Sequence, residues 1–129
     1  MKRAVFFPYH PDLDTLIEYK DALKGWEIGG FVSFKEDRGP IHALNLTLGV
    51  EDASYSQLLH GCDVVVLLDN YRDYKVDKYY QIIEDAIRYK KELFVTPSAR
   101  MHLNMDKFEG RYQLLQRLPG GIDLQTYPY

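Results

Sequence analysis

The stretch DVVVLLD, Asp63–Asp69, decides the fold of this 129-residue chain. It is a continuous run of branched apolar residues with an acid at each end. Such a run is typical of a strand that is buried on both faces of a parallel sheet. A strand of this kind needs neighbouring strands and covering helices, so the sequence on either side should alternate between extended and helical patterns.

The sequence before this run contains two strand patterns, over 3–9 and 26–34, and two helix patterns. The first helix, over 12–25, begins at an aspartate that can cap it and ends at a glycine. The second, over 54–61, begins at Ser54 with a glutamine three residues later, which is the spacing of a capping box. Two adjacent glycines inside the second strand pattern indicate a bulge or close backbone packing.

The sequence after the run predicts a helix over 76–91, where apolar residues recur at helical spacing. A short buried strand over 93–96 stops at a proline, and a last helix is expected over 105–117, interrupted by a glycine. Residues 122–129 read as a final strand or its beginning, whereas 35–50 mix periods and predict no single element.

Strands that alternate with helices predict an α/β fold, a parallel sheet with helices on both faces. Right-handed crossovers give the strand order 2-1-3-4, with a fifth strand at the edge. We therefore expect a Rossmann-like or flavodoxin-like three-layer sandwich of four or five strands. The length fits one domain over residues 1–129. Because the chain stops where the sequence pattern of a further strand begins, we also consider it the N-terminal domain of a longer protein.

Composition narrows the classes of partner. A net charge of −3 gives no reason to expect nucleic-acid binding, which needs a basic domain. The sequence has neither a signal-peptide core nor an apolar run long enough to span a bilayer, so no membrane association is expected. The only cysteine, Cys62, fits a reducing, cytoplasmic compartment and is expected to be an inert core thiol.

A ligand site is expected beyond the carboxyl ends of the strands, at the switch point of the strand order. The side chains that follow strands one and three there are His10, Asp69 and Asn70, and Ser98 and Arg100 follow strand four. Arg100 is the strongest anion anchor of this set, because a guanidinium holds a carboxylate or phosphate with two parallel hydrogen bonds. We expect a small anionic ligand there. A surface salt bridge is the alternative role of Arg100.

Several standard cofactor sites do not fit this edge. The junction PYHPDLD, residues 8–14, has no glycine to cradle a phosphate, and its two acids would repel one. No Gly-Lys-Ser/Thr sequence for a P-loop occurs. Asp69 and Thr96 resemble the acceptor aspartate and switch threonine of receiver domains, but the acidic pair that would bind Mg²⁺ after the first strand is missing. No cofactor is expected.

The four histidines lie far apart in sequence, without the paired spacing of a metal site, so no metal is expected. The simpler role for His10 is a packed ring bonded to a backbone carbonyl. The alternative is an enzyme domain that acts on a small anionic molecule. His10 would then be its general acid/base and Asp69 would orient it. The sequence leaves open whether the chain is an enzyme.

Tyrosine is unusually frequent, with 11 residues in the chain. Five lie on or just before the helix expected over 76–91, and they cannot all face the core: Tyr71, Tyr74, Tyr79, Tyr80 and Tyr89. Because exposed aromatic side chains are common at protein interfaces, we expect self-association or contact with a further domain. Surface tyrosines without a role are the alternative.

Three segments carry a family resemblance: VFFPY over 5–9, GFVSFK over 30–35 and LGVEDASYSQLLHGCDVVVLL over 48–68. Together with the intervening sequence, residues 4–96 resemble the N-terminal region of uncharacterised bacterial proteins of peptide maturation systems. Such proteins occur with radical-SAM enzymes that modify ribosomally made peptides. The resemblance implies a Rossmann-like N-terminal domain and includes no catalytic motif. The expected function is therefore a binding or interaction domain, non-catalytic by itself, in a peptide maturation system.

Overall fold

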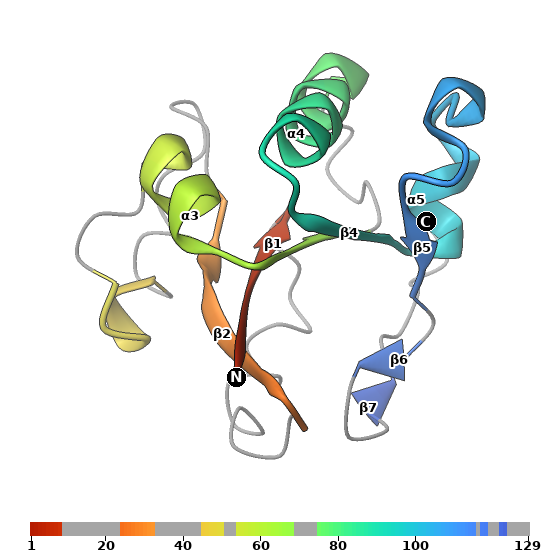
Figure 1. Cartoon of the computed structure of the whole chain (residues 1–129). Helices are drawn as coiled ribbons and strands as arrows, with labels where there is room; N and C mark the ends of the chain where they lie inside the picture. Colours follow the sequence, from red (N-terminus) through yellow and green to blue (C-terminus); the bar gives the residue numbers. More distant parts are fainter. Residues whose placement is uncertain are drawn as a thin grey trace.

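A five-stranded parallel sheet forms the centre of the structure, a computed structural model (Figure 1). Residues 1–8, 24–32, 45–50, 54–68 and 75–115 are described, with the backbone of 117–118 and 122–123. The strands are β1 (Lys2–Phe7), β2 (Trp26–Phe31), β3 (Val64–Leu67), β4 (Glu92–Val95) and β5 (Gln113–Leu114). Their order, β2-β1-β3-β4-β5, confirms the predicted order 2-1-3-4 with a fifth strand, but that fifth strand is Gln113–Leu114 rather than the expected segment 122–129.

The run that decided the fold lies in the middle of this sheet. β3 pairs in parallel with β1 on one side and β4 on the other. All four of its residues are buried, as the continuous apolar run predicts. Val65 and Leu67 belong to the core cluster on one face of the sheet, and Val64 and Val66 to the cluster on the other face.

The helices are α3 (Tyr55–Gly61), α4 (Val76–Arg88), α5 (Pro97–Met101) and a short 3-10 helix, η2 (Asp106–Phe108). Their buried residues all join the cluster around Val65 and Leu67, and α3 and α4 lie on the same side of the sheet (Figure 1). Residues 12–23 of the helix predicted over 12–25 lie outside the described residues, and at its predicted end Gly25 adopts φ +81°. The parallel sheet, its strand order and its helices give an α/β fold of the Rossmann-like or flavodoxin-like kind.

The two central helices form where the sequence predicts them. The side chain of Ser54 accepts a hydrogen bond from the backbone N–H of Gln57 at 3.4 Å, and α3 ends at Gly61. In α4, the buried residues Tyr79, Ile82, Ile83 and Ala86 recur at helical spacing. This stripe faces the sheet and accounts for the periodicity of the sequence.

The prediction of a helix over 105–117 is wrong. Gly110 adopts φ +77°, which ends the helical path after η2, and Gln113–Leu114 then pairs with β4 as β5. The free edge of β4 offers backbone hydrogen bonds, and Leu115 N–H continues the ladder to Val95 O at 3.0 Å. Tertiary pairing therefore overrides the local helical pattern.

Two smaller elements also differ from the sequence prediction. α5 was not expected, although Thr96 and Pro97 are a standard helix start: the Thr96 hydroxyl accepts the N–H of Ala99 at 3.2 Å. The strand expected over 122–129 is represented by β7 (Ile122–Asp123), which pairs antiparallel with β6 (Arg117–Leu118) in a separate two-stranded sheet. Residues 124–129 lie outside the described part.

The glycine pair of β2 has the predicted effect. The register with β1 shifts between Ala4 and Val5, where one residue of β2 is skipped. A Cβ on Gly29 would lie 2.3 Å from Cγ of Arg3, so the side chain of β1 crosses β2 at that point. Gly30 has φ +141° and lies against Leu58 of α3. The two glycines therefore allow β2 to pack closely against β1 on one side and against α3 on the other.

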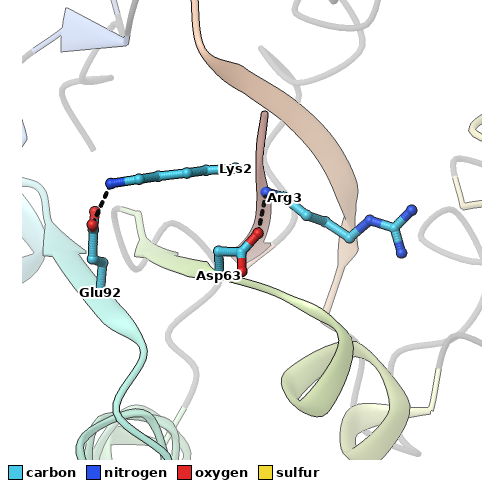
Figure 2. Close-up of polar contacts among 4 residues, drawn as sticks. All are labelled: Lys2, Arg3, Asp63 and Glu92. Carbon is cyan, nitrogen blue, oxygen red and sulfur yellow. Dashed lines mark hydrogen bonds and ion pairs between the residues drawn. The ribbon is translucent and has the colours of Figure 1, made fainter.

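Charged side chains hold the strands together at their amino ends (Figure 2). Lys2 of β1 reaches past β3 to pair with Glu92 of β4, and the Asp63 carboxylate accepts the backbone N–H of Arg3 at 2.9 Å. This edge is thus occupied by contacts within the sheet. Any ligand site of the usual kind belongs at the opposite, carboxyl edge.

Candidate functional site

The switch point predicted as the ligand site lies between the carboxyl ends of β1 and β3. His10, Asp69 and Asn70, which sequence reasoning placed there, lie outside the described residues, as does the proposed pairing of His10 with Asp69. The described residues that lead to this point are buried. Leu68, directly after β3, accepts a hydrogen bond from the Tyr79 hydroxyl at 3.1 Å. The end of β3 is therefore fixed to α4.

A hollow of about 620 Å³ lies next to the carboxyl end of β4, between α5 and η2. We refer to it as the α5–η2 hollow. Its lining begins at Pro97, two residues after the end of β4, and continues through α5 to Tyr112, just before β5. Its volume is in the range of small-molecule sites. A second hollow of about 260 Å³ adjoins it and shares Asn104 and Asp106.

The lining combines charged and apolar side chains. Arg100 provides a guanidinium, and Asp106 and Glu109 provide carboxylates. All three side chains are exposed, and among the described residues none of them takes part in an ion pair. The apolar part includes Met101, which is 83% exposed, and the half-buried Tyr112. Of the predicted ligand residues, Arg100 therefore lines a hollow, whereas the half-buried Ser98 does not line it.

The wall of the hollow is anchored to α4. The Tyr80 hydroxyl accepts the backbone N–H of Asn104 at 2.7 Å, and the Asn104 side chain accepts the N–H of Asp106 at 3.2 Å. Lys107 lies 5.0 Å from the centre of the Phe108 ring and pairs with Glu84 of α4 at 3.6 Å. These contacts fix η2 to α4, so the side of the hollow that η2 forms is held in place.

The predicted tyrosine interface is only partly available at the surface. Tyr79 is 1% exposed and packs edge-on against Phe7 at 5.0 Å, so its assignment to an interface is wrong. Tyr80 is half-buried and supports the hollow. Tyr89 is 44% exposed and contacts the His60 ring at 4.7 Å. Tyr71 and Tyr74 lie outside the described residues.

Other reactive groups of the described residues are built into the core. Cys62 is 2% exposed, its thiol donates to Leu59 O at 3.2 Å, and burial raises its pKa. The Tyr55 hydroxyl donates to Asp85 at 2.6 Å, and burial followed by this bond raises its pKa. Within the ranges that the structure describes, no group of His, Cys, Asp and Glu side chains is placed to hold a metal ion. None of the helices described is both long and apolar enough to cross a membrane.

Sequence reasoning missed most of the hollow. Asp106, Glu109 and Tyr112 were assigned to a helix, and a helical face gave no reason to place them beside Arg100. The Thr-Pro pair at 96–97 was a usable signal, because this pair begins a helix, α5, that contains Arg100. Gly110 was a second signal, because its positive φ ends η2.

No protein-family model, curated protein or solved structure matches this chain.

Proposed function

We propose that this chain is a non-catalytic binding domain that holds a small ligand in the α5–η2 hollow, with Arg100 as the group that binds the ligand's anion. The observation that carries the proposal is the position of this guanidinium. It lines a hollow of about 620 Å³ next to the carboxyl end of a parallel strand, the edge at which α/β sheets bind ligands.

The state of Arg100 supports this role over that of a surface salt bridge. Its side chain is exposed, and no ion pair of Arg100 is found within the described part of the chain. Arg88, by comparison, lies 3.9 Å from Asp85 on α4. An arginine without a carboxylate partner keeps its five donors available for a ligand.

The apolar lining supports a ligand with an organic body. Met101 and Tyr112 place a thioether and an aromatic ring beside the guanidinium. Sites of this size generally combine apolar side chains with a few polar groups that orient the ligand. The Cys62 thiol is buried and has a raised pKa, so it is not available as a nucleophile.

The resemblance over residues 4–96 suggests the setting. A domain that binds a small ligand or a peptide end is a useful part of a peptide maturation system, where the modified peptide has to be held. We propose such a setting for this chain, with a radical-SAM enzyme as a partner. Co-purification of the two proteins from cells that express both, set against either protein alone, tests this part of the proposal.

A thermal-shift screen tests the binding function. Wild type is compared with Arg100→Ala and with Arg88→Ala, a matched loss of an exposed arginine on a different helix. A set of amino acids, short peptides, carboxylic acids and nucleotides is applied to each. We expect at least one carboxylate ligand to raise the melting temperature of wild type and of Arg88→Ala but not of Arg100→Ala. Equal shifts in all three proteins would contradict the role of Arg100.

A further inference from the structure

We propose that the α5–η2 hollow selects a ligand that carries a cationic group as well as an anionic one, as a free amino acid or a short unblocked peptide does. The inference rests on the proposed function, because it names the class of ligand for the same hollow. It follows from the charges of the lining taken together, of which Arg100 is only one.

The lining contains one cation and two anions. Arg100 contributes the guanidinium, whereas Asp106 and Glu109 contribute carboxylates that are exposed and have no ion-pair partner among the described residues. The nearest lysine in sequence, Lys107, is already paired with Glu84 at 3.6 Å. The lining therefore has a formal charge of −1, from one positive and two negative side chains.

This balance disfavours a ligand with negative charge alone. A phosphate or dicarboxylate bound at Arg100 would share a hollow of about 620 Å³ with two carboxylates, and like charges in one site raise the free energy of binding. A ligand with a carboxylate and an ammonium group presents an opposite charge to each side of the lining. An ammonium supplies three donors, which two carboxylates can accept.

The apolar lining indicates what separates the two charges. Met101 is 83% exposed, and Leu103 and Tyr112 are half-buried. These side chains can cover an apolar amino-acid side chain, and the flexible thioether of methionine adapts to different shapes. An apolar amino acid or a dipeptide with an aromatic residue is thus the probe that best matches the hollow.

Asp106 also has a structural position, since it is the first residue of η2. A carboxylate there stabilises the start of a helical turn whether or not a ligand binds. Loss of stability in an Asp106 variant therefore says nothing about the ligand. The test has to measure how affinity depends on the charges of the ligand itself.

Isothermal titration calorimetry with three related dipeptides provides this test. Glycyl-phenylalanine carries both charges, N-acetyl-glycyl-phenylalanine carries only the carboxylate, and glycyl-phenylalanine amide carries only the ammonium group. We expect the unblocked dipeptide to bind wild type, and each blocked form to bind about two- to fivefold more weakly, as expected for loss of a partly exposed charge pair.

Variants assign the two charges to their partners. Asp106→Asn combined with Glu109→Gln should weaken glycyl-phenylalanine about fivefold and leave the acetylated form unchanged or slightly tighter. The control, Asp77→Asn, removes an exposed carboxylate from the first turn of α4 and should leave all three affinities unchanged. Circular dichroism confirms that each variant is folded.

The outcomes separate this inference from the proposed function. If the acetylated dipeptide binds as tightly as the unblocked one, and Arg100→Gln weakens both, the proposed function stands and the inference is wrong. If the amide binds as tightly as the unblocked dipeptide, Arg100 does not bind the anion and both are wrong. Failure of all three dipeptides to bind would overturn this inference, whereas the proposed function is decided by the wider set of ligands in the thermal-shift screen.

Discussion

Replacement of Asn45 by alanine should lower the free energy of unfolding by about 2–6 kcal/mol. Asn45 is 1% exposed, and its side-chain amide pairs with both backbone groups of Phe31 on the outer edge of β2. Its Oδ1 accepts the Phe31 N–H at 2.8 Å, and its Nδ2 donates to the Phe31 carbonyl at 3.1 Å. The amide thus takes the place of the peptide group of a further strand.

The size of this loss in unfolding free energy follows from the backbone groups that alanine would leave without a hydrogen-bond partner. Phe31 is fully buried, so its N–H and carbonyl would both lose their partner in a place that excludes water. Each unsatisfied buried group costs about 1–3 kcal/mol. The sum is a large part of the roughly 5–15 kcal/mol that stabilises a typical domain.

Urea unfolding followed by circular dichroism measures this loss. The midpoint should fall by about 1–3 M in urea for a slope of about 2 kcal/mol/M, with the slope unchanged. Asn104→Ala is the matched control, because Asn104 is exposed and its side chain accepts one hydrogen bond, from the N–H of Asp106. We expect that control to lose less than about 1 kcal/mol. Equal losses in the two variants would refute the account of the β2 edge.

Four further results are expected. Gly30→Ala should destabilise the fold by more than about 1 kcal/mol in urea unfolding, because its Cβ would lie 2.8 Å from a Leu58 methyl at φ +141°. Gly61→Ala, with open space around its Cβ at the end of α3, should instead stabilise by up to about 0.5–1 kcal/mol, and a loss would contradict the geometry. Tyr55→Phe should cost about 1 kcal/mol at pH 7. Because folding raises the pKa of Tyr55, the stability due to its neutral form is full below about pH 10. Above that pH the difference from wild type should shrink by up to about 1.4 kcal/mol per pH unit, and a constant difference would refute the assignment. Cys62 should react with a thiol reagent only after denaturation, so rapid labelling of the native protein would contradict its burial.

The central part of the fold follows from the sequence because two strong patterns decide it. The apolar run at 63–69 can only be buried on both faces, and the stripe at 76–91 has one apolar face, so their pairing in β3 and α4 was predictable. Gly29 and Gly30 likewise indicated the bulge in β2. In each case the local pattern and the tertiary contact agree.

The candidate site was less predictable because it depends on tertiary pairing. The segment 105–117 has helical spacing, yet the open edge of β4 draws Gln113–Leu114 into the sheet. That pairing is what brings Tyr112 and Glu109 to the same hollow as Arg100. Tyr80 is a second case in which a tertiary contact could not be predicted. The high frequency of tyrosine predicts an interface for Tyr80, whereas in the structure its hydroxyl accepts the backbone N–H of Asn104.

The most direct test of the binding function is a titration of the ¹⁵N-labelled protein with glycyl-phenylalanine, followed by the shifts of its backbone amide resonances. The account predicts shifts concentrated in residues 98–112, with their loss in Arg100→Gln and their retention in Arg88→Gln. Shifts centred on another part of the chain, or identical titrations in the two arginine variants, would contradict the claim that the α5–η2 hollow is the ligand site.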